Sequence, residues 1–169
     1  MAEPNRSRVP SNITIRHDLR PGDIGILTYL HGTIYAEAYG WDYTFEAYVA
    51  GPLAEFARSM GDRERIWLVE RDQKLAGSVA IVDAGEAAAQ LRWLLLCPDL
   101  RGRGLGRLLV EDAIRFCRDR GYRSVFLWTV STLDAAISLY RSDGFCLTEE
   151  TTHELWGDVL TEQRYELVL

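Results

Sequence analysis

The chain has 169 residues, of which 47% are hydrophobic, 26% charged and 11% aromatic, and its formal net charge is 19 − 25 = −6. A chain of this length forms one domain with a full hydrophobic core and needs neither metals nor disulfides. The composition excludes disordered, collagen-like and membrane-spanning chains, and the first residues lack the apolar stretch of a secretory signal. We therefore expect a cytoplasmic protein that enters no membrane and, given its negative charge, binds no nucleic acid.

The charge is unevenly distributed along the chain. Seven arginines and four acidic residues between 99 and 123 give 7 − 4 = +3, whereas one arginine and seven acidic residues between 143 and 166 give 1 − 7 = −6. Two such segments can bind an anion and a cation at different places, although solvated surfaces carry similar charges. The three cysteines, Cys97, Cys117 and Cys146, have neither disulfide nor zinc spacing, so we expect reduced thiols and no metal site.

The predicted elements follow one another without an internal repeat. Residues 1–12 contain two prolines and mostly polar side chains, which is typical of a flexible arm, and one domain is predicted over 13–169. In order, the patterns predict a strand at 13–16, helices from 23 to the Tyr39-Gly40-Trp41-Asp42 break and over 44–60, strands over 65–70, 75–82 and 88–96, a helix over 105–120, a strand over 125–128, a helix over 133–142, and strands over 145–149 and 164–169. Short connections make the three middle strands antiparallel, and the helix over 105–120 joins two parallel strands.

The segment Arg101-Gly102-Arg103-Gly104-Leu105-Gly106-Arg107 lies between a predicted buried strand and an amphipathic helix. Glycines let the backbone approach a ligand closely, and the amide N–H groups at a helix N-terminus point toward an anion. Nearby arginines and the positive end of the helix dipole make a pyrophosphate the natural ligand. The spacing is neither that of a Walker loop nor that of the dinucleotide fingerprint. As an alternative, the same residues would also form a tight strand-to-helix turn with solvent-facing arginines and no bound ligand.

Two motifs together point to one family. The Arg-x-x-Gly-x-Gly spacing after a Leu-x-x-x-Pro strand end resembles the acetyl-CoA pyrophosphate loop of the GNAT superfamily of N-acyltransferases, and Leu139-Tyr140-Arg141-Ser142-Asp143-Gly144-Phe145 is similar to its Leu-Tyr-x-x-x-Gly-Phe signature. The resemblance covers about 13–169. It implies an α/β (α+β) fold with a mixed, mostly antiparallel seven-stranded sheet, flanking helices and a central parallel strand pair. The stretch 31–42 also resembles the acetyltransferase half of MarR/GNAT fusion proteins, although the chain has no room for their DNA-binding half.

The resemblance implies an N-acetyltransferase that moves an acetyl group from its cosubstrate acetyl-CoA to a small amine or a peptide amine, by direct attack in a ternary complex. The backbone of Leu94, Leu95 and Leu96 would pair with the pantetheine arm, and a main-chain N–H of this strand would stabilise the oxyanion. The pyrophosphate would be held by Arg101, Gly102, Arg103, Gly104, Leu105, Gly106 and Arg107. Tyr140 would protonate or hydrogen-bond the departing thiolate.

The general base is not marked by the motifs. Two positions that carry an acid in many family members are occupied here by Gln90 and Trp128, and neither side chain can accept a proton. Candidates elsewhere are His31, Glu37 and Glu86. A water chain would also serve an amine of low pKa, and Cys97 would serve only as the nucleophile of a ping-pong scheme.

The acceptor pocket is expected between the first two helices and the acidic C-terminal strands. Its candidate lining residues are Tyr35, Tyr39, Trp41, Tyr43 and Tyr48, which suit a cationic amine with apolar surface unless the rings simply fill the core. Exposed strand edges near the C-terminus make a homodimer a reasonable expectation.

One alternative function stays open at this point. The usual acids are missing, and Leu133 stands where the family places an asparagine that contacts pantetheine. These departures fit a catalytically weak CoA-binding sensor or interaction module. A DNA-binding regulator is disfavoured by the charge and by the absence of a helix-turn-helix pattern.

Overall fold

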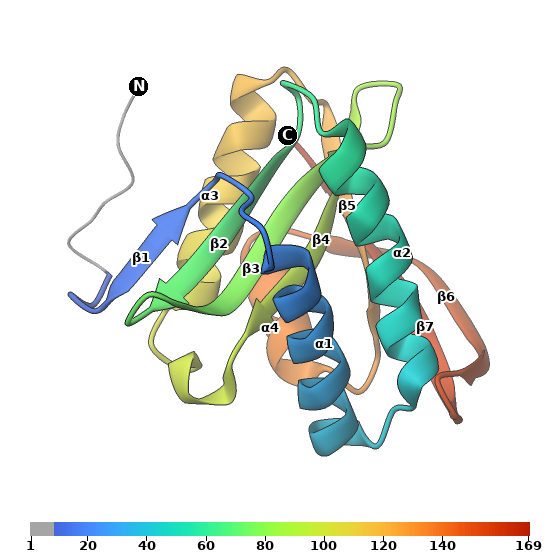
Figure 1. Ribbon diagram of the computed structural model, residues 1–169. Helices are drawn as coiled ribbons and strands as arrows, with labels where there is room; N and C mark the ends of the chain where they lie inside the picture. The colour runs from blue at the N-terminus through green and yellow to red at the C-terminus, as the bar shows by residue number, and fades with distance from the viewer. Residues whose placement is uncertain (1–8) are drawn as a thin grey trace.

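The computed structural model describes residues 9–169 as one seven-stranded sheet with helices on both faces (Figure 1). The elements are β1 Ile13–Arg16, α1 Asp23–Tyr39, α2 Tyr43–Ser59, β2 Arg65–Arg71, β3 Lys74–Asp83, β4 Ala88–Leu96, the short 3-10 helix Pro98–Leu100, α3 Leu105–Asp119, β5 Ser124–Val130, α4 Asp134–Ser142, β6 Cys146–Leu155 and β7 Asp158–Val168. The strand order is β1-β2-β3-β4-β5-β7-β6, and β4 and β5 form the parallel pair of an otherwise antiparallel sheet. The predicted fold class is therefore confirmed.

Residues 1–8 of the predicted N-terminal arm lie outside the described residues. Of the remainder, Val9 packs against the core that contains α3. No helix within the described chain is long and apolar enough to cross a membrane.

The sheet separates two hydrophobic cores. In β2, Trp67 and Val69 pack with α3 and α4, whereas Ile66 and Leu68 pack with α1 and α2. This alternation follows from strand geometry, because successive side chains point to opposite faces of a sheet. Figure 1 shows α1 and α2 on one face and α3 and α4 on the other. The continuous apolar runs in the central strands are thus explained by burial on both sides.

The parallel pair is short, and the two strands diverge beyond it. Ala88, Ala89 and Gln90 pair with 124–126 of β5. Beyond Gln90, β4 remains paired with β3 as far as Leu96, and β5 remains paired with β7 as far as its last residue. The facing edges of β4 and β5 therefore have no strand partner along this stretch of the described structure.

A β-bulge in β4 lies just beyond the point where its pairing with β5 ends. Ser78 pairs with Leu95 and Ala80 pairs with Arg92, so β4 contains one residue more than β3 between these pairs. Trp93 lies in this bulge and has a left-handed backbone conformation, with φ 51°. The fully buried Ser78 hydroxyl donates a hydrogen bond to the Trp93 carbonyl oxygen at 2.7 Å, which satisfies a main-chain acceptor that the bulge removes from the ladder.

The last two strands are longer than the sequence predicts. Instead of separate strands over 145–149 and 164–169, β6 and β7 form one long hairpin that turns at Trp156 and Gly157. Both turn residues have positive φ, 51° and 84°, as a two-residue hairpin turn requires. The side chains of β6 are exposed on both faces along almost its whole length. No alternation of polar and apolar residues could therefore mark its end.

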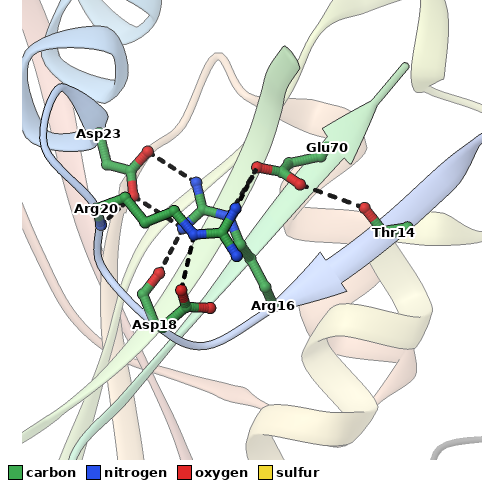
Figure 2. A network of polar contacts seen from close by, with 6 residues as sticks. All are labelled: Thr14, Arg16, Asp18, Arg20, Asp23 and Glu70. Atoms are coloured by element: carbon green, nitrogen blue, oxygen red, sulfur yellow. Dashed lines mark hydrogen bonds and ion pairs between the residues drawn. The ribbon is translucent and has the colours of Figure 1, made fainter. Parts of the chain in front are cut away.

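Arg16 links β1, β2 and the start of α1 in a network of charges (Figure 2). Its guanidinium donates to both carboxylate oxygens of Asp23 at 2.8 and 2.7 Å and to Glu70 at 2.7 Å. Burial raises the pKa of the Asp23 carboxyl, but the hydrogen bonds from Arg16 and the Arg20 main chain outweigh it and hold this pKa below its ordinary value. The network fixes the position of the start of α1 against β1 and β2.

Replacing Arg16 with methionine should destabilise the fold by roughly 3 kcal/mol, because the partly buried carboxylates of Asp23 and Glu70 lose their closest cation. Arg58→Met is the matched control, since Arg58 pairs with Glu55 on an exposed helix surface, and it should cost less than about 1 kcal/mol. Urea unfolding of both variants measures the difference. Equal free energies of unfolding for the two variants would contradict this account of the network.

Candidate active site

Two cavities adjoin where β4 and β5 diverge. The first, which we call the aromatic cavity, is lined by His31, Tyr35, Trp41, Phe45, Tyr48, Val49, Gln90, Leu91, Arg92, Trp93, Leu94, Leu127, Trp128, Thr129, Val130, Leu133, Ala136, Tyr140, Trp156 and Glu162. The second, the loop cavity, is lined by Tyr35, Tyr39, Leu94, Leu95, Leu96, Arg101, Gly102, Gly104, Gly106, Arg107, Leu133, Ala135, Ala136 and Leu139. Tyr35, Leu94, Leu133 and Ala136 belong to both linings. A ligand in one cavity therefore meets a ligand in the other at these four residues.

The loop cavity brings together most of the residues predicted to bind acetyl-CoA. The residues that line it are Leu94, Leu95, Leu96, Arg101, Gly102, Gly104, Gly106 and Arg107. Arg103 and Leu105 do not line it: Arg103 is exposed, and the Leu105 side chain is buried in the core. Leu105 is the first residue of α3, so its contribution to a ligand would come from its main-chain N–H.

The glycines of the loop form a tight turn at the start of α3. Gly102 and Gly104 have φ of 72° and 80°, a left-handed backbone that side chains with a Cβ rarely adopt. Gly104 caps α3 without a side chain, so the first amide N–H groups of this helix have no capping partner. Arg101 lies beside them, with its Nε donating to the Leu96 carbonyl oxygen at 3.0 Å. Amide groups, helix dipole and guanidinium together suit a pyrophosphate.

Tyr140 reaches the aromatic cavity from α4. Its side chain is 6% exposed and packs edge-on against Phe145, with ring centroids 5.9 Å apart. Burial, with a smaller effect from nearby Tyr35, raises the pKa of the Tyr140 phenol above its ordinary value. The hydroxyl is therefore protonated at neutral pH and can act as a hydrogen-bond donor or an acid.

His31 reaches the same cavity from α1, in a neutral state. Its Nδ1 atom lies 2.7 Å from the Leu27 carbonyl oxygen, which can only accept, so Nδ1 carries the proton. The other nitrogen, Nε2, is buried and has no hydrogen-bond partner among residues 9–169. Burial lowers the pKa of His31 to about 4. His31 can thus accept a hydrogen bond at neutral pH but holds a proton poorly.

The other predicted base candidates lie elsewhere. Glu37 is exposed near the end of α1, Glu86 lies in the turn between β3 and β4, and neither lines the aromatic or the loop cavity. Cys97 lines neither cavity, and burial raises the pKa of its thiol, which disfavours a thiolate nucleophile. Within the described chain, no three His, Cys, Asp or Glu residues are placed to hold a metal ion.

The aromatic residues predicted for the acceptor pocket divide among three places. Tyr35, Trp41 and Tyr48 line the aromatic cavity, Tyr39 lines the loop cavity, and Tyr43 is 81% exposed. Their rings are packed closely; those of Tyr35 and Trp41, for example, have centroids 5.0 Å apart.

Several lining residues were not predicted from the sequence, among them Trp156, Glu162 and Arg92. Trp156 packs on Trp41 with ring centroids 4.5 Å apart, and Glu162 follows on β7. Both belong to the hairpin whose length the sequence did not reveal. Arg92 lies on the correctly predicted β4, but the pattern of charges gave no reason to select it.

A sequence profile of the acetyltransferase (GNAT) family matches residues 32–145, a range that contains the glycine loop and Tyr140. The chain belongs to the GNAT family of acetyltransferases. An uncharacterised N-acetyltransferase of Schizosaccharomyces pombe is 36% identical over 147 residues, which are 85% of this chain and 89% of that protein. Human N-acetyltransferase 8B is 32% identical over 96 residues, 54% of this chain and 42% of that protein, so the chain spans less than half of that relative's length.

Solved structures share the fold of this GNAT chain. YncA from Salmonella typhimurium, determined with its cofactor acetyl-CoA, has a TM-score of 0.72 at 20% identity, covering 94% of each chain. The spermidine N-acetyltransferase from Vibrio cholerae, in complex with CoA and spermine, has a TM-score of 0.70 at 21% identity, covering 94% of this chain and 96% of that one. Acetyl-CoA is the cosubstrate of the family.

The buried state of His31 predicts a pH effect on stability. Its pKa of about 4 in the folded protein lies below the unfolded value near 6.5, so folding favours the neutral ring. Stability from this group is complete above pH 6.5 and falls toward pH 4, by roughly 3 kcal/mol. Between pH 7.0 and 4.5, urea unfolding should show a loss roughly 2–3 kcal/mol larger for the native chain than for His31→Gln. An identical pH dependence of the two proteins would rule out the buried neutral histidine.

Proposed function

We propose that this GNAT chain transfers the acetyl group of acetyl-CoA to a primary amine by direct attack in a ternary complex. The observation that carries the proposal is the junction of the two cavities at Tyr35, Leu94, Leu133 and Ala136. Donor and acceptor can occupy separate cavities and still bring their reacting atoms together. Holding both reactants side by side is itself a large part of catalysis.

The loop cavity fits the donor. The N-terminus of α3, with Arg101 and Arg107, offers amide and guanidinium donors to the pyrophosphate. The unpaired edge of β4 offers the main-chain groups of Leu94, Leu95 and Leu96 to the pantetheine arm, as an added strand would use them. When bound, acetyl-CoA supplies an acetyl group already activated as a thioester.

The chain's own residues then have three tasks. A main-chain N–H of β4 near the bulge stabilises the negative charge that develops on the acetyl oxygen. The protonated hydroxyl of Tyr140 donates to the departing thiolate. His31 Nε2 accepts a hydrogen bond from an N–H of the acceptor and orients it. Glu37, which lies outside both cavities, has no role in this scheme, so the acceptor's proton leaves through water in the cavity.

The aromatic cavity is proposed to hold a small amine or a peptide amine. Its rings cover the apolar part of such a molecule, and Glu162 offers a carboxylate. We also propose a cytoplasmic location, which the three free cysteines support, and a homodimer formed through the exposed edge of β6. The likeness to the acetyltransferase half of MarR/GNAT fusion proteins stays a prediction that rests on residues 31–42.

A CoA-binding sensor is the second candidate, because the aromatic cavity presents Gln90 and Trp128 where many family members carry an acid. The two candidates differ in turnover. An acetyltransferase releases free CoA thiol when an acceptor amine is added, whereas a sensor binds CoA and releases none with any amine.

Gly106→Asp should weaken CoA binding at least tenfold, because it adds a carboxylate where the pyrophosphate is proposed to lie. The fold should tolerate the change: a Cβ at Gly106 would meet Leu139 and Leu96 at ordinary distances of 3.6 and 3.7 Å, and an acidic residue suits the first turn of a helix. Gly25→Asp is the matched control, since it places the same residue in the exposed first turn of α1, where a Cβ meets nothing within 4 Å. Isothermal calorimetry that finds equal CoA affinities for both variants would refute the loop cavity as the donor site.

Tyr140→Phe should lower kcat by about 100-fold while leaving CoA affinity nearly unchanged, because the lost hydroxyl acts on the leaving thiolate rather than on binding. Thiol release measured over a panel of amines gives kcat, and calorimetry gives the affinity. A Tyr140→Phe protein with the kcat of the native chain would exclude the acid role of Tyr140.

A further inference from the structure

Arg92 is a cation in the aromatic cavity that the proposed reaction leaves unused. It lies on β4 two residues before Leu94, which lies at the junction of the cavities. Its guanidinium lies over the Trp93 ring, 4.8 Å from the centroid, and interacts with the Tyr48 hydroxyl. The side chain is half-buried, so water hydrates only part of the guanidinium.

The charge of Arg92 is not balanced within residues 9–169. Arg16, which is also partly buried, pairs with the carboxylates of Asp23 and Glu70, whereas Arg92 forms no ion pair with a described carboxylate. Burial accordingly lowers the pKa of Arg92, although a guanidinium stays charged at neutral pH. The acid in the cavity lining is Glu162, whose carboxylate lies 2.8 Å from His153 Nε2.

A half-buried guanidinium with one hydroxyl contact has several N–H donors left. A guanidinium matches a carboxylate best, because its planar N–H groups can bind both oxygens at once. The phosphates of acetyl-CoA are not the natural partner, since the loop cavity has its own arginines, Arg101 and Arg107, and Arg92 does not line it. The anion that would bind Arg92 therefore belongs to the acceptor, which is the ligand of the aromatic cavity.

We propose that Arg92 binds a carboxylate of the acceptor, so that the chain selects amines that carry a carboxylate close to the amino group, as amino acids do. This inference rests on the proposed acetyl transfer and narrows its acceptor class. The spacing supports it, because Arg92 is two residues from Leu94 at the junction, a separation of at most about 7 Å along the chain, which is within the reach of one small molecule.

The other walls of the cavity define the rest of the acceptor. The rings of Tyr35, Trp41, Phe45 and Trp156 form an apolar wall against which an apolar side chain of the acceptor can pack. Arg92 repels a second positive charge, so a simple diamine or polyamine fits this cavity less well than a zwitterion. The acceptor class is thus an amino acid with an apolar side chain.

Matched acceptors test the inference directly. Phenylalanine and phenethylamine, leucine and isoamylamine, and tyrosine and tyramine differ within each pair by one carboxylate. For the native chain, kcat/KM should be at least tenfold higher for the amino acid of at least one pair. Arg92→Met should raise KM for that amino acid at least tenfold and change kcat/KM for its amine partner less than threefold. Arg118→Met, at an exposed position of α3, should behave as the native chain does.

A second measurement uses only the native chain, so it does not depend on whether a variant folds. With the native chain, 3-phenylpropionate should compete with the acceptor, whereas 3-phenylpropanamide, its neutral counterpart, should inhibit at least tenfold more weakly. Equal inhibition by the two compounds, or acetylation of amines with no preference for a carboxylate, overturns the inference and leaves the proposed acetyl transfer standing. Absence of thiol release with every acceptor, while CoA still binds, overturns the acetyl transfer and this inference with it.

Discussion

The divergence of β4 and β5 is the constraint on which the rest of the structure depends. Three paired residues hold the strands together, and beyond them β4 contains the bulge at Trp93, whose carbonyl oxygen accepts a hydrogen bond from the buried Ser78 hydroxyl. Main-chain groups at a sheet interior normally have partners. Those on the facing edges of β4 and β5 beyond Gln90 have no strand partner in the described structure, and the Leu96 carbonyl oxygen there accepts from Arg101. The edge can therefore take a ligand. The glycine loop follows β4 after the short 3-10 helix Pro98–Leu100, which places the proposed anion site at one end of the same gap.

The helices on the two faces supply complementary parts of the site. Tyr140 comes from α4, while His31 and Tyr35 come from α1, whose start is fixed by the ion pairs of Arg16. In the proposed reaction, donor binding, leaving-group protonation and acceptor binding would therefore be carried by different elements that meet at one gap. The uneven charge of the sequence has a similar explanation. Two arginines of the basic segment, Arg101 and Arg107, line the loop cavity, and β7 of the acidic segment provides Glu162 to the aromatic cavity.

Much of this could be predicted from sequence, because local physics determines it. β4 is predicted with its observed bounds, since a buried apolar run ends at Pro98, and the glycine loop and Tyr140 stand in motifs. The sequence does not decide which of the two candidate bases on α1, His31 or Glu37, faces the cavity. At 100° per residue, six residues separate them by 600°, or 240° around α1, so only one can face the cavity. The hairpin that carries Trp156 and Glu162 was missed because β6 is exposed on both faces, which removes the alternation that strand prediction needs.

The central claim is that CoA adds to the free edge of β4 as a strand would. Amide hydrogen exchange, measured with and without CoA, tests this most directly. The account predicts that exchange slows at the amides of 94–96 and of 104–107 when CoA binds, while the exposed strand β6 is unchanged. Binding of CoA with unchanged exchange at both of these segments would contradict it.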